Sequence, residues 1–161
     1  MILLFSAGIM LFCIQFNVHA QEMPPRPISA FFVQNLAFGA FSISLTGGTV
    51  TVTPFGSRMA TGGVVLVNMG YPYFPAVFGL EGNAGTILHP LNGPDAILSG
   101  SNGGSITLHL GDSNPGDPVI LSVAPPGQTQ VSVGGTLIVG SILANPAGFY
   151  SGSFSIMFIQ E

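Results

Sequence analysis

The chain has 161 residues, of which 47% are hydrophobic and 5% are charged, and its formal net charge at pH 7 is -4. This length suits one domain that buries its own core, and the hydrophobic content argues against a disordered chain. Two arginines and no lysine cannot form the basic stripe that neutralises phosphates, which disfavours nucleic acid and anionic membranes as partners. Small polar residues must therefore solvate the surface, and such a surface opposes association only weakly.

The first twenty residues are typical of a secretory signal peptide. An apolar run from Ile2 to Phe16 leads into Val18-His19-Ala20, which places small residues three and one before a cleavage point ahead of Gln21. The run is short for a membrane span, so no stable span is expected after cleavage. No Lys or Arg precedes the run, and an uncleaved anchor or a misassigned start is the alternative. Cleavage would remove Cys13, the one cysteine, and leave a mature chain without disulfides.

Beyond Pro27 the sequence predicts an all-β chain, because no window shows a sustained helical period and short apolar or alternating runs recur between turn sequences. Uneven loops between the strands favour an antiparallel sandwich over a barrel. We expect a signal peptide at 1–20, a Pro-rich mature N-terminus at 21–27 and a single β-sandwich domain at 28–161. The expected strands are 28–33, 36–41, 49–53, 64–67, 74–80, 86–88, 105–110, 119–123, 128–133, 136–139 and 150–159.

Some of these runs predict which faces are covered. Val50 and Val52 share one face of 49–53, with threonines on the other, as in a sheet with one wet face. Residues 64–67 are apolar on both faces, which predicts a central strand. Gly-Gly pairs begin at positions 47, 62, 103 and 134, and their uneven spacing indicates turns before strands and not a repeat of fixed period.

The last expected strand raises the question of what covers it. Its core face is expected to carry alternate residues from Tyr150 to Phe158. The opposite face begins with serines and ends with Met157 and Ile159, so the strand is apolar on both faces only near its end. Two interpretations follow: a central strand whose end is covered by a loop, which we favour, or an end at which a neighbour docks on Met157 and Ile159.

The loop "GDSNPGDP" holds the densest polar cluster. Asp112, Asn114 and Asp117 lie close enough in sequence to ligate a hard cation through oxygen. A calcium loop usually supplies more carboxylates and a bidentate Glu, so Asx and Pro-Gly turns are the commoner interpretation.

Aromatic and basic residues suggest a second binding site. In "GYPYFP", Tyr71, Tyr73 and Phe74 are a candidate platform for a sugar, although such rings more often pack against the end of a sandwich. Arg58 is a candidate anchor for a ligand carboxylate, and an arginine that braces a turn through hydrogen bonds to carbonyls is the commoner case.

Catalytic residues are not recognisable in the sequence. His89 and His109 have Asp95 nearby in the chain, but no nucleophile elbow, zinc-binding helix motif or carboxylate pair in a recognisable setting accompanies them. A solvent-facing strand histidine is the more common case. We therefore expect no enzyme activity and no cofactor.

Three stretches carry a resemblance to a bacterial family. They are "NLAFGAF" (35–41), "GGTVTVTPFGSRMATGGVVLV" (47–67) and "QVSVGGTLIVGSILANPAGFYSGSFSIMFI" (130–159). In their order and spacing, residues 28 to 160 resemble domain of unknown function 4402, found in secreted proteins of Gram-negative bacteria. The resemblance implies a location in the periplasm, at the cell surface or outside the cell of such a bacterium. It does not imply a task.

The ending at 147–152, which runs into the last strand, is also similar to chaperone-usher pilins and spore-coat-U-like proteins. This similarity implies an immunoglobulin-like sandwich that a strand from the next subunit completes. The chain departs from that pattern at 21–27, where three prolines cannot donate hydrogen bonds, and in having no cysteine pair. Exchange through the N-terminus is therefore not expected, whereas lateral or C-terminal association stays open.

These observations lead us to expect a secreted, non-enzymatic structural or adhesive surface protein, of which a pilin-like subunit of an extracellular assembly is the most specific form. Its expected partners are further copies of itself or other surface proteins, with Met157 and Ile159 as the assembly contact. The alternative is a self-contained extracellular binding module for glycans or peptides, which would use the loops "GYPYFP" or "GDSNPGDP".

Overall fold

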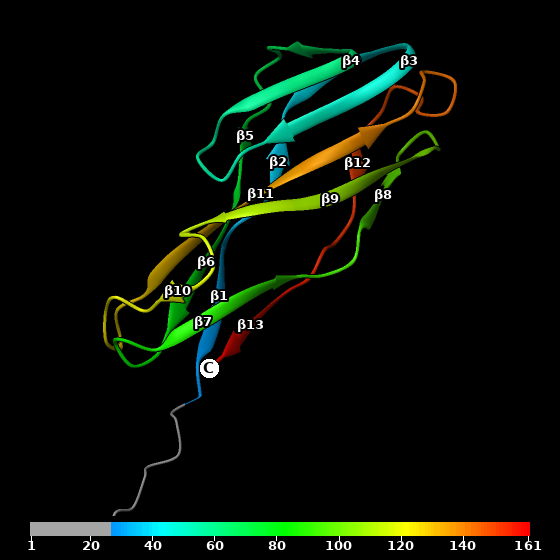
Figure 1. The fold of residues 1–161 in the computed structure, drawn as a ribbon. Coiled ribbons are helices and arrows are strands. Elements are labelled where there is room, and N and C mark those ends of the chain that lie inside the picture. The colour runs from blue at the N-terminus through cyan, green and yellow to red at the C-terminus, as the bar shows by residue number, and fades with distance from the viewer. Residues whose placement is uncertain (1–26) are drawn as a thin grey trace, which may run out of the picture.

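The computed structural model describes residues 27–161, which form thirteen strands and no helix (Figure 1). The predicted signal peptide and residues 21–26 lie outside the described residues. All pairs of strands are antiparallel, so the predicted all-β class is confirmed. The strands are β1 (Ser29–Gln34), β2 (Ala37–Phe38), β3 (Ala40–Val52), β4 (Arg58–Val67), β5 (Tyr73–Phe74), β6 (Ala76–Glu81), β7 (Ile87–Asn92), β8 (Ala96–Gly100), β9 (Ser105–Asn114), β10 (Val119–Ile120), β11 (Thr129–Val139), β12 (Tyr150–Ser151) and β13 (Ile156–Gln160).

Strand β11 is the central strand of the largest sheet and pairs with three other strands. This sheet has eight strands in the order β1-β6-β11-β9-β8-β12, with β3 paired to β11 and β4 paired to β3. Along one edge of β11, residues 129–133 pair with β6 and residues 135–139 pair with β3, while β9 pairs along the other edge. One continuous strand therefore joins the two halves of the molecule.

Gly134 and Gly135 lie where β11 changes partner. A Cβ added at Gly134 would lie 2.6 Å from the carbonyl oxygen of Val52, so the close approach of β3 requires a residue without a side chain here. The predicted turn at this Gly-Gly pair, between strands at 128–133 and 136–139, is wrong. The pair lies inside one strand because the glycines serve the approach of a second backbone and not a reversal of the chain.

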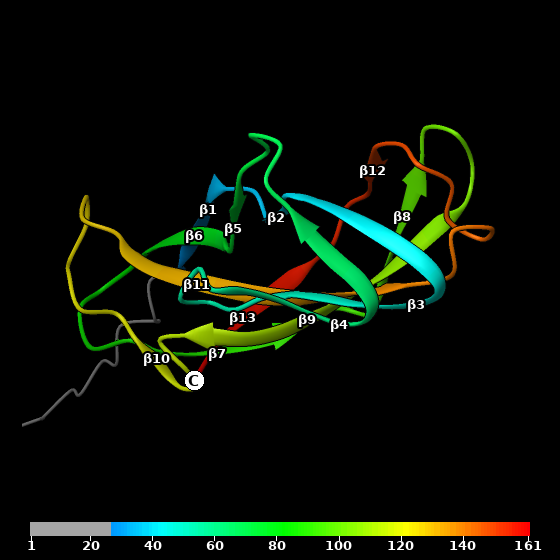
Figure 2. The same ribbon diagram turned by 90° about the horizontal axis from the view of Figure 1, so that it is seen from above.

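The sheet β10-β7-β13 forms a second layer over one half of the large sheet. Leu88 of β7 and Val119 of β10 pack with Leu80 of β6 and Val131 of β11 in one buried cluster, here called the lower core. Figure 2 shows β7 and β10 on the opposite side of β11 from β1 and β6. The order β1-β6-β11-β9 in one layer and the pairing of β7 with β13 in the other match strands A-B-E-D and C-F of an immunoglobulin-like sandwich.

A second buried cluster, here called the upper core, lies under the other half of the large sheet. It is built around Val50 and Val52 of β3, Ile106 of β9 and Leu137 of β11. Both valines are fully buried, as their alternation with threonine predicts. On the wet face, the hydroxyls of Thr51 and Thr136 lie 2.9 Å apart across the β3–β11 pair.

The prediction that residues 64–67 form a central strand is wrong. They belong to β4, which pairs only with β3 among the described strands. Val64 is buried but Val65 is exposed, so an apolar outer face stays open to solvent. Strand β8 was not predicted. The expected strand 36–41 is divided between β2 and the start of β3, and β3 continues through most of the expected strand 49–53. Long apolar strands do not by themselves show which of their edges is paired.

The preferred interpretation of the last strand is also wrong. The expected strand 150–159 is divided into β12 and β13, and among the described strands β13 is the last of its sheet and pairs only with β7. Met157 and Ile159 are 59% and 50% exposed, so no loop within residues 27–161 covers them. Figure 1 shows β13 beyond β7 at the rim of the molecule.

Candidate functional site

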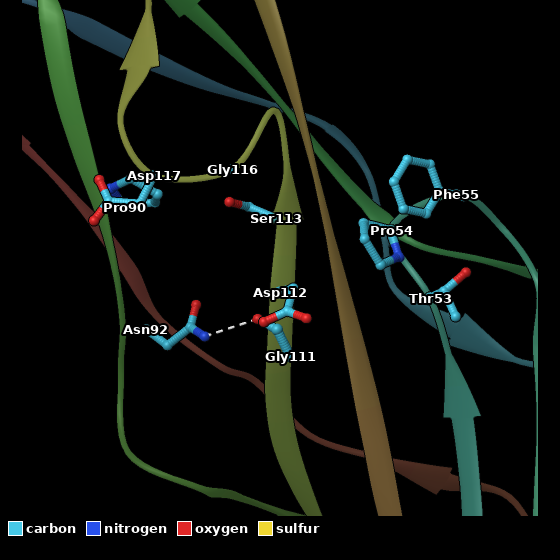
Figure 3. Close-up of a pocket in the computed structure, with 10 residues that line it drawn as sticks. All are labelled: Thr53, Pro54, Phe55, Pro90, Asn92, Gly111, Asp112, Ser113, Gly116 and Asp117. Carbon is cyan, nitrogen blue, oxygen red and sulfur yellow. Dashed lines mark hydrogen bonds between the residues drawn. The ribbon is translucent and has the colours of Figure 1, made fainter.

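A hollow of about 580 Å³, open to solvent, lies where the β3–β4 turn faces β7 and β9 (Figure 3). One side comes from the turn, and the other comes from β7, the end of β9 and the loop that follows β9. The residues that line it are Thr53, Pro54, Phe55, Pro90, Asn92, Gly111, Asp112, Ser113, Gly116 and Asp117.

The β3–β4 turn presents an aromatic ring to solvent. The N–H of Gly56 donates to the carbonyl of Thr53 at 2.9 Å, and the N–H of Ser57 donates to the Thr53 hydroxyl at 3.1 Å. Gly56 has a φ of 83°, which a residue with a side chain rarely adopts. These bonds hold the turn, and Phe55 at its tip is 77% exposed. The ring therefore stands in solvent without support from the core.

Polar groups form the opposite side of the hollow. The Asn92 side chain donates to the carbonyl of Gly111 at 2.9 Å, which ties β7 to β9 (Figure 3). Asp112 follows on β9 and is exposed, with its carboxylate between Asn92 and the aromatic side in Figure 3. Carboxylates and amides beside an exposed ring are the groups that recognise a neutral, hydroxyl-rich ligand.

His89 positions the second carboxylate of the hollow. Its Nδ1 lies 2.6 Å from Oδ1 of Asp117, and its Nε2 lies 4.0 Å from Oε2 of Glu161. The Asp117 bond links β7 to the loop between β9 and β10. All three side chains are well exposed, so solvent screens these ion pairs and they add little to stability.

Asp95 and His109, the other two residues considered for catalysis in the sequence, contact each other. Nδ1 of His109 lies 2.7 Å from Oδ1 of Asp95, and both side chains are more than half exposed. Neither lines the hollow. A pair of this kind orients an imidazole, but a catalytic role also needs a group that attacks or stabilises substrate at hydrogen-bond distance.

The predicted cation ligands are only partly brought together. Asp112 and Asp117 line the same hollow, but Asn114 does not. One oxygen of Asp117 is bonded to His89. No group of three or more His, Cys, Asp or Glu side chains within residues 27–161 is arranged to hold a metal ion. The cation site stays a prediction, and it would have to rely on backbone carbonyls and water.

The three aromatic residues of the predicted sugar platform each have different neighbours in the structure. Arg58 places its guanidinium carbon 4.4 Å from the centre of the Tyr73 ring, which covers one face of that ring. The Tyr71 ring meets that of Phe149 edge to face, with centroids 6.0 Å apart, and Phe74 is half-buried. These rings lie outside the hollow. As a sugar platform they stay a prediction.

Arg58 braces the backbone, the commoner of its two interpretations. Its Nη1 donates to the carbonyl of Phe38 at 2.9 Å and to that of Ala40 at 3.4 Å. The guanidinium thereby joins β4 to the start of β3 and to the β2–β5 pair. Fewer of the guanidinium N–H groups are therefore available to a ligand carboxylate.

Sequence reasoning missed Phe55 and Asn92. The signal for Phe55 was present, because an aromatic residue between Pro54 and Gly56 in a turn has few neighbours to bury it. Asn92 gave no such signal, since its place beside Gly111 depends on the contact between β7 and β9.

Comparisons with known proteins support the first of the two sequence resemblances and do not confirm the similarity to pilins. No helix among the described residues is long and apolar enough to cross a membrane. Neither the curated proteins nor the solved structures contain a match to this chain. The family model described as "Domain of unknown function (DUF4402)" matches residues 28–159, and the chain therefore belongs to that family.

Proposed function

We propose that this protein is a secreted, non-enzymatic structural or adhesive surface protein of a Gram-negative bacterium. It works by associating with copies of itself or with other surface proteins, and a pilin-like subunit of an extracellular assembly is its most specific form. The carrying observation is that β1 and β13, each of which pairs along one edge only among the described strands, expose apolar side chains to solvent. These side chains, here called the apolar rim, are Phe31, Phe32, Val33, Met157 and Ile159.

The sparse charge supports the proposal. Residues 27–161 contain six Asp, Glu and Arg residues in total, and none lies on β1 or within β13. Charged side chains are the usual means by which a protein keeps exposed strand edges from pairing. An apolar rim without such charges favours association, since like-charge repulsion is weak there.

The test is the state of the purified protein at rising concentration, followed by sedimentation velocity and negative-stain electron microscopy. We expect particles larger than a monomer that persist in 1 M NaCl, a salt level whose screening length is about 3 Å, because apolar contacts do not depend on charge. Monodisperse monomers at all concentrations, together with no binding to the surface of the producing cells, would contradict the proposal.

The second candidate is an extracellular binding module for glycans or peptides, and the hollow favours it. Phe55 offers an exposed ring, and Asp112 and Asn92 offer polar groups on the opposite side. A glycan array tests it with three variants, Phe55→Ala, Asp112→Asn and Tyr71→Ala. Loss of binding in the first two alone would place the site in the hollow, and loss in the third alone would place it at the predicted platform. An array without wild-type binding removes the glycan form of this candidate.

A further inference from the structure

The outer edge of β13 carries unpaired backbone groups in a regular order. The N–H of Gly93 donates to the carbonyl of Ser155 at 2.9 Å, and the N–H of Glu161 donates to that of Ile87 at 3.2 Å. Hydrogen-bonded and non-bonded pairs alternate in an antiparallel ladder, and the β7–β13 register has no shift. Ile156, Phe158 and Gln160 therefore point their N–H and C=O groups away from β7, and no strand within residues 27–161 pairs with them.

Other open edges of the fold are less suited to pairing. Strand β1 has a register shift between Phe32 and Gln34. Strand β4 has Gly62 with a φ of 68° near its middle. Strands β10 and β12 have two residues each. In contrast, β13 is regular and contains neither proline nor a charged residue, and these are the devices that normally protect an edge.

We propose that two copies of this chain pair β13 against β13 about a two-fold axis at Phe158. Antiparallel pairing about this residue places Ile156 opposite Gln160 of the second copy and Phe158 opposite itself. The three outward-facing residues of each copy then form hydrogen-bonded pairs, and the two sheets β10-β7-β13 join into one sheet of six strands. The interface is isologous, so the same patch serves both copies.

The outer face of this pairing is self-complementary. Met157 lies opposite Ile159 of the second copy, in a pair without backbone hydrogen bonds, where side chains approach most closely. Leu91 of β7 is opposite Met157 within one copy and is also exposed, so it extends the apolar stripe on both sides of the axis. Glu161 lies opposite Ser155 of the second copy, so the pairing brings no like charges together.

Strand β1 of the other layer lies beside the open edge of β13. Phe78 of β6 contacts both Phe32 of β1 and Phe158 of β13 edge to face, with centroids 5.7 Å apart in each pair. Strand β1 therefore lies on the same side of the molecule as the open edge of β13. Phe32 is 55% exposed although it faces these core rings. A strand added to the open edge of β13 would lie beneath β1 and cover this ring.

The inference rests on the proposed function, because it names a second copy as the first partner of the apolar rim. It also limits that function. A two-fold interface closes on itself, so it yields a dimer, and larger assemblies need a second contact elsewhere on the surface.

A charge-reversal pair at the outer face tests the register. Met157→Glu with Ile159→Glu places carboxylates opposite each other across the axis, whereas Met157→Glu with Ile159→Arg places opposite charges there. We expect a dissociation constant at least roughly tenfold above wild type for the first variant and within about threefold of it for the second. Sedimentation equilibrium measures the constants, and far-UV circular dichroism and the melting temperature verify folding.

Three results would overturn the pairing: a monomeric wild type, wild-type affinity in both variants, or an equal loss in both. If the charged variants fail to fold, Gln160→Pro decides, because it removes an outward N–H and leaves the ladder with β7 intact; a dimer of unchanged affinity would then count against the pairing. A Glu/Glu variant whose particles match those of wild type in size and in dissociation constant contradicts the pairing alone. A wild-type dimer that builds nothing larger and binds no surface contradicts the proposed function alone.

Discussion

Arg58 shows how a single charged residue can organise a surface that has few charges. It reaches the carbonyls of Phe38 and Ala40 and covers the ring of Tyr73, so three strands meet at one guanidinium. Lysine carries the same charge but lacks the planar guanidinium, whose Nη1 reaches both carbonyls while its plane lies over the ring. The residue is therefore expected to be structural, whatever the loop beside it binds.

Arg58→Lys is expected to lower the free energy of unfolding by about 1–2 kcal/mol, since it loses a charge-assisted hydrogen bond at a half-buried site. Tyr73→Leu removes the ring contact and leaves the hydrogen bonds, and it should cost less than Arg58→Lys. Urea unfolding at neutral pH measures both variants. Equal stability of Arg58→Lys and wild type would show that the guanidinium does not brace the strands.

At the scale of the element, β11 connects the two cores because two glycines allow it to change partner. Val131 and Val133 face the lower core, and Leu137 and Val139 face the upper core. Between them, Gly134 admits the backbone of β3, and a Cβ on Gly135 would lie 2.9 Å from the side chain of Leu36. Strand β11 can continue through positions 134 and 135 only because neither residue has a side chain that would collide with these neighbours.

Gly134→Ala should destabilise the fold by about 1–3 kcal/mol, the usual cost of overpacking, because the atom nearest the new methyl group belongs to the backbone of Val52. Gly116→Ala is the matched control, since nothing lies within 4 Å of a Cβ there. Thermal unfolding compares the two. A Gly134→Ala protein as stable as Gly116→Ala would show that β3 can move away from β11 at little cost.

At the scale of the whole molecule, the two cores are expected to unfold together. Leu36 and Phe154 pack against both clusters, and β11 contributes to each. Contacts of this kind make a small domain cooperative. We expect the lower core to be the less stable of the two. Strand β13 covers it on one side and pairs only along its β7 edge among the described strands.

Leu88→Ala in the lower core is expected to cost about 2–5 kcal/mol, as large-to-small changes at buried positions do. Its effect should reach the upper core, where Tyr150 packs. Tyrosine fluorescence and far-UV circular dichroism should therefore report the same melting temperature as each other in Leu88→Ala, and again in Ile106→Ala, with both variants below wild type. Separate transitions for the two probes would mean that the cores are independent.

The sequence by itself determined the local features of this protein. Alternation of valine with threonine predicted the buried Val50 and Val52, and the absence of helical periods predicted the all-β class. Composition predicted a surface with few charges. The family resemblance over residues 28 to 160 was visible in three stretches and is confirmed by the match over residues 28–159. Each of these depends on neighbours in sequence, so no knowledge of strand order was needed.

Only the tertiary structure decided which strands have open edges and which loops meet. The apolar residues 64–67 resemble a central strand, yet β4 lies at an edge, and β13 lies at another. Phe55 and Asp112 are far apart in sequence and line one hollow because β3 and β9 pair with opposite edges of β11. Pairing partners are chosen by contacts between distant segments, and an apolar residue facing a core has the same sequence pattern as one facing a second molecule.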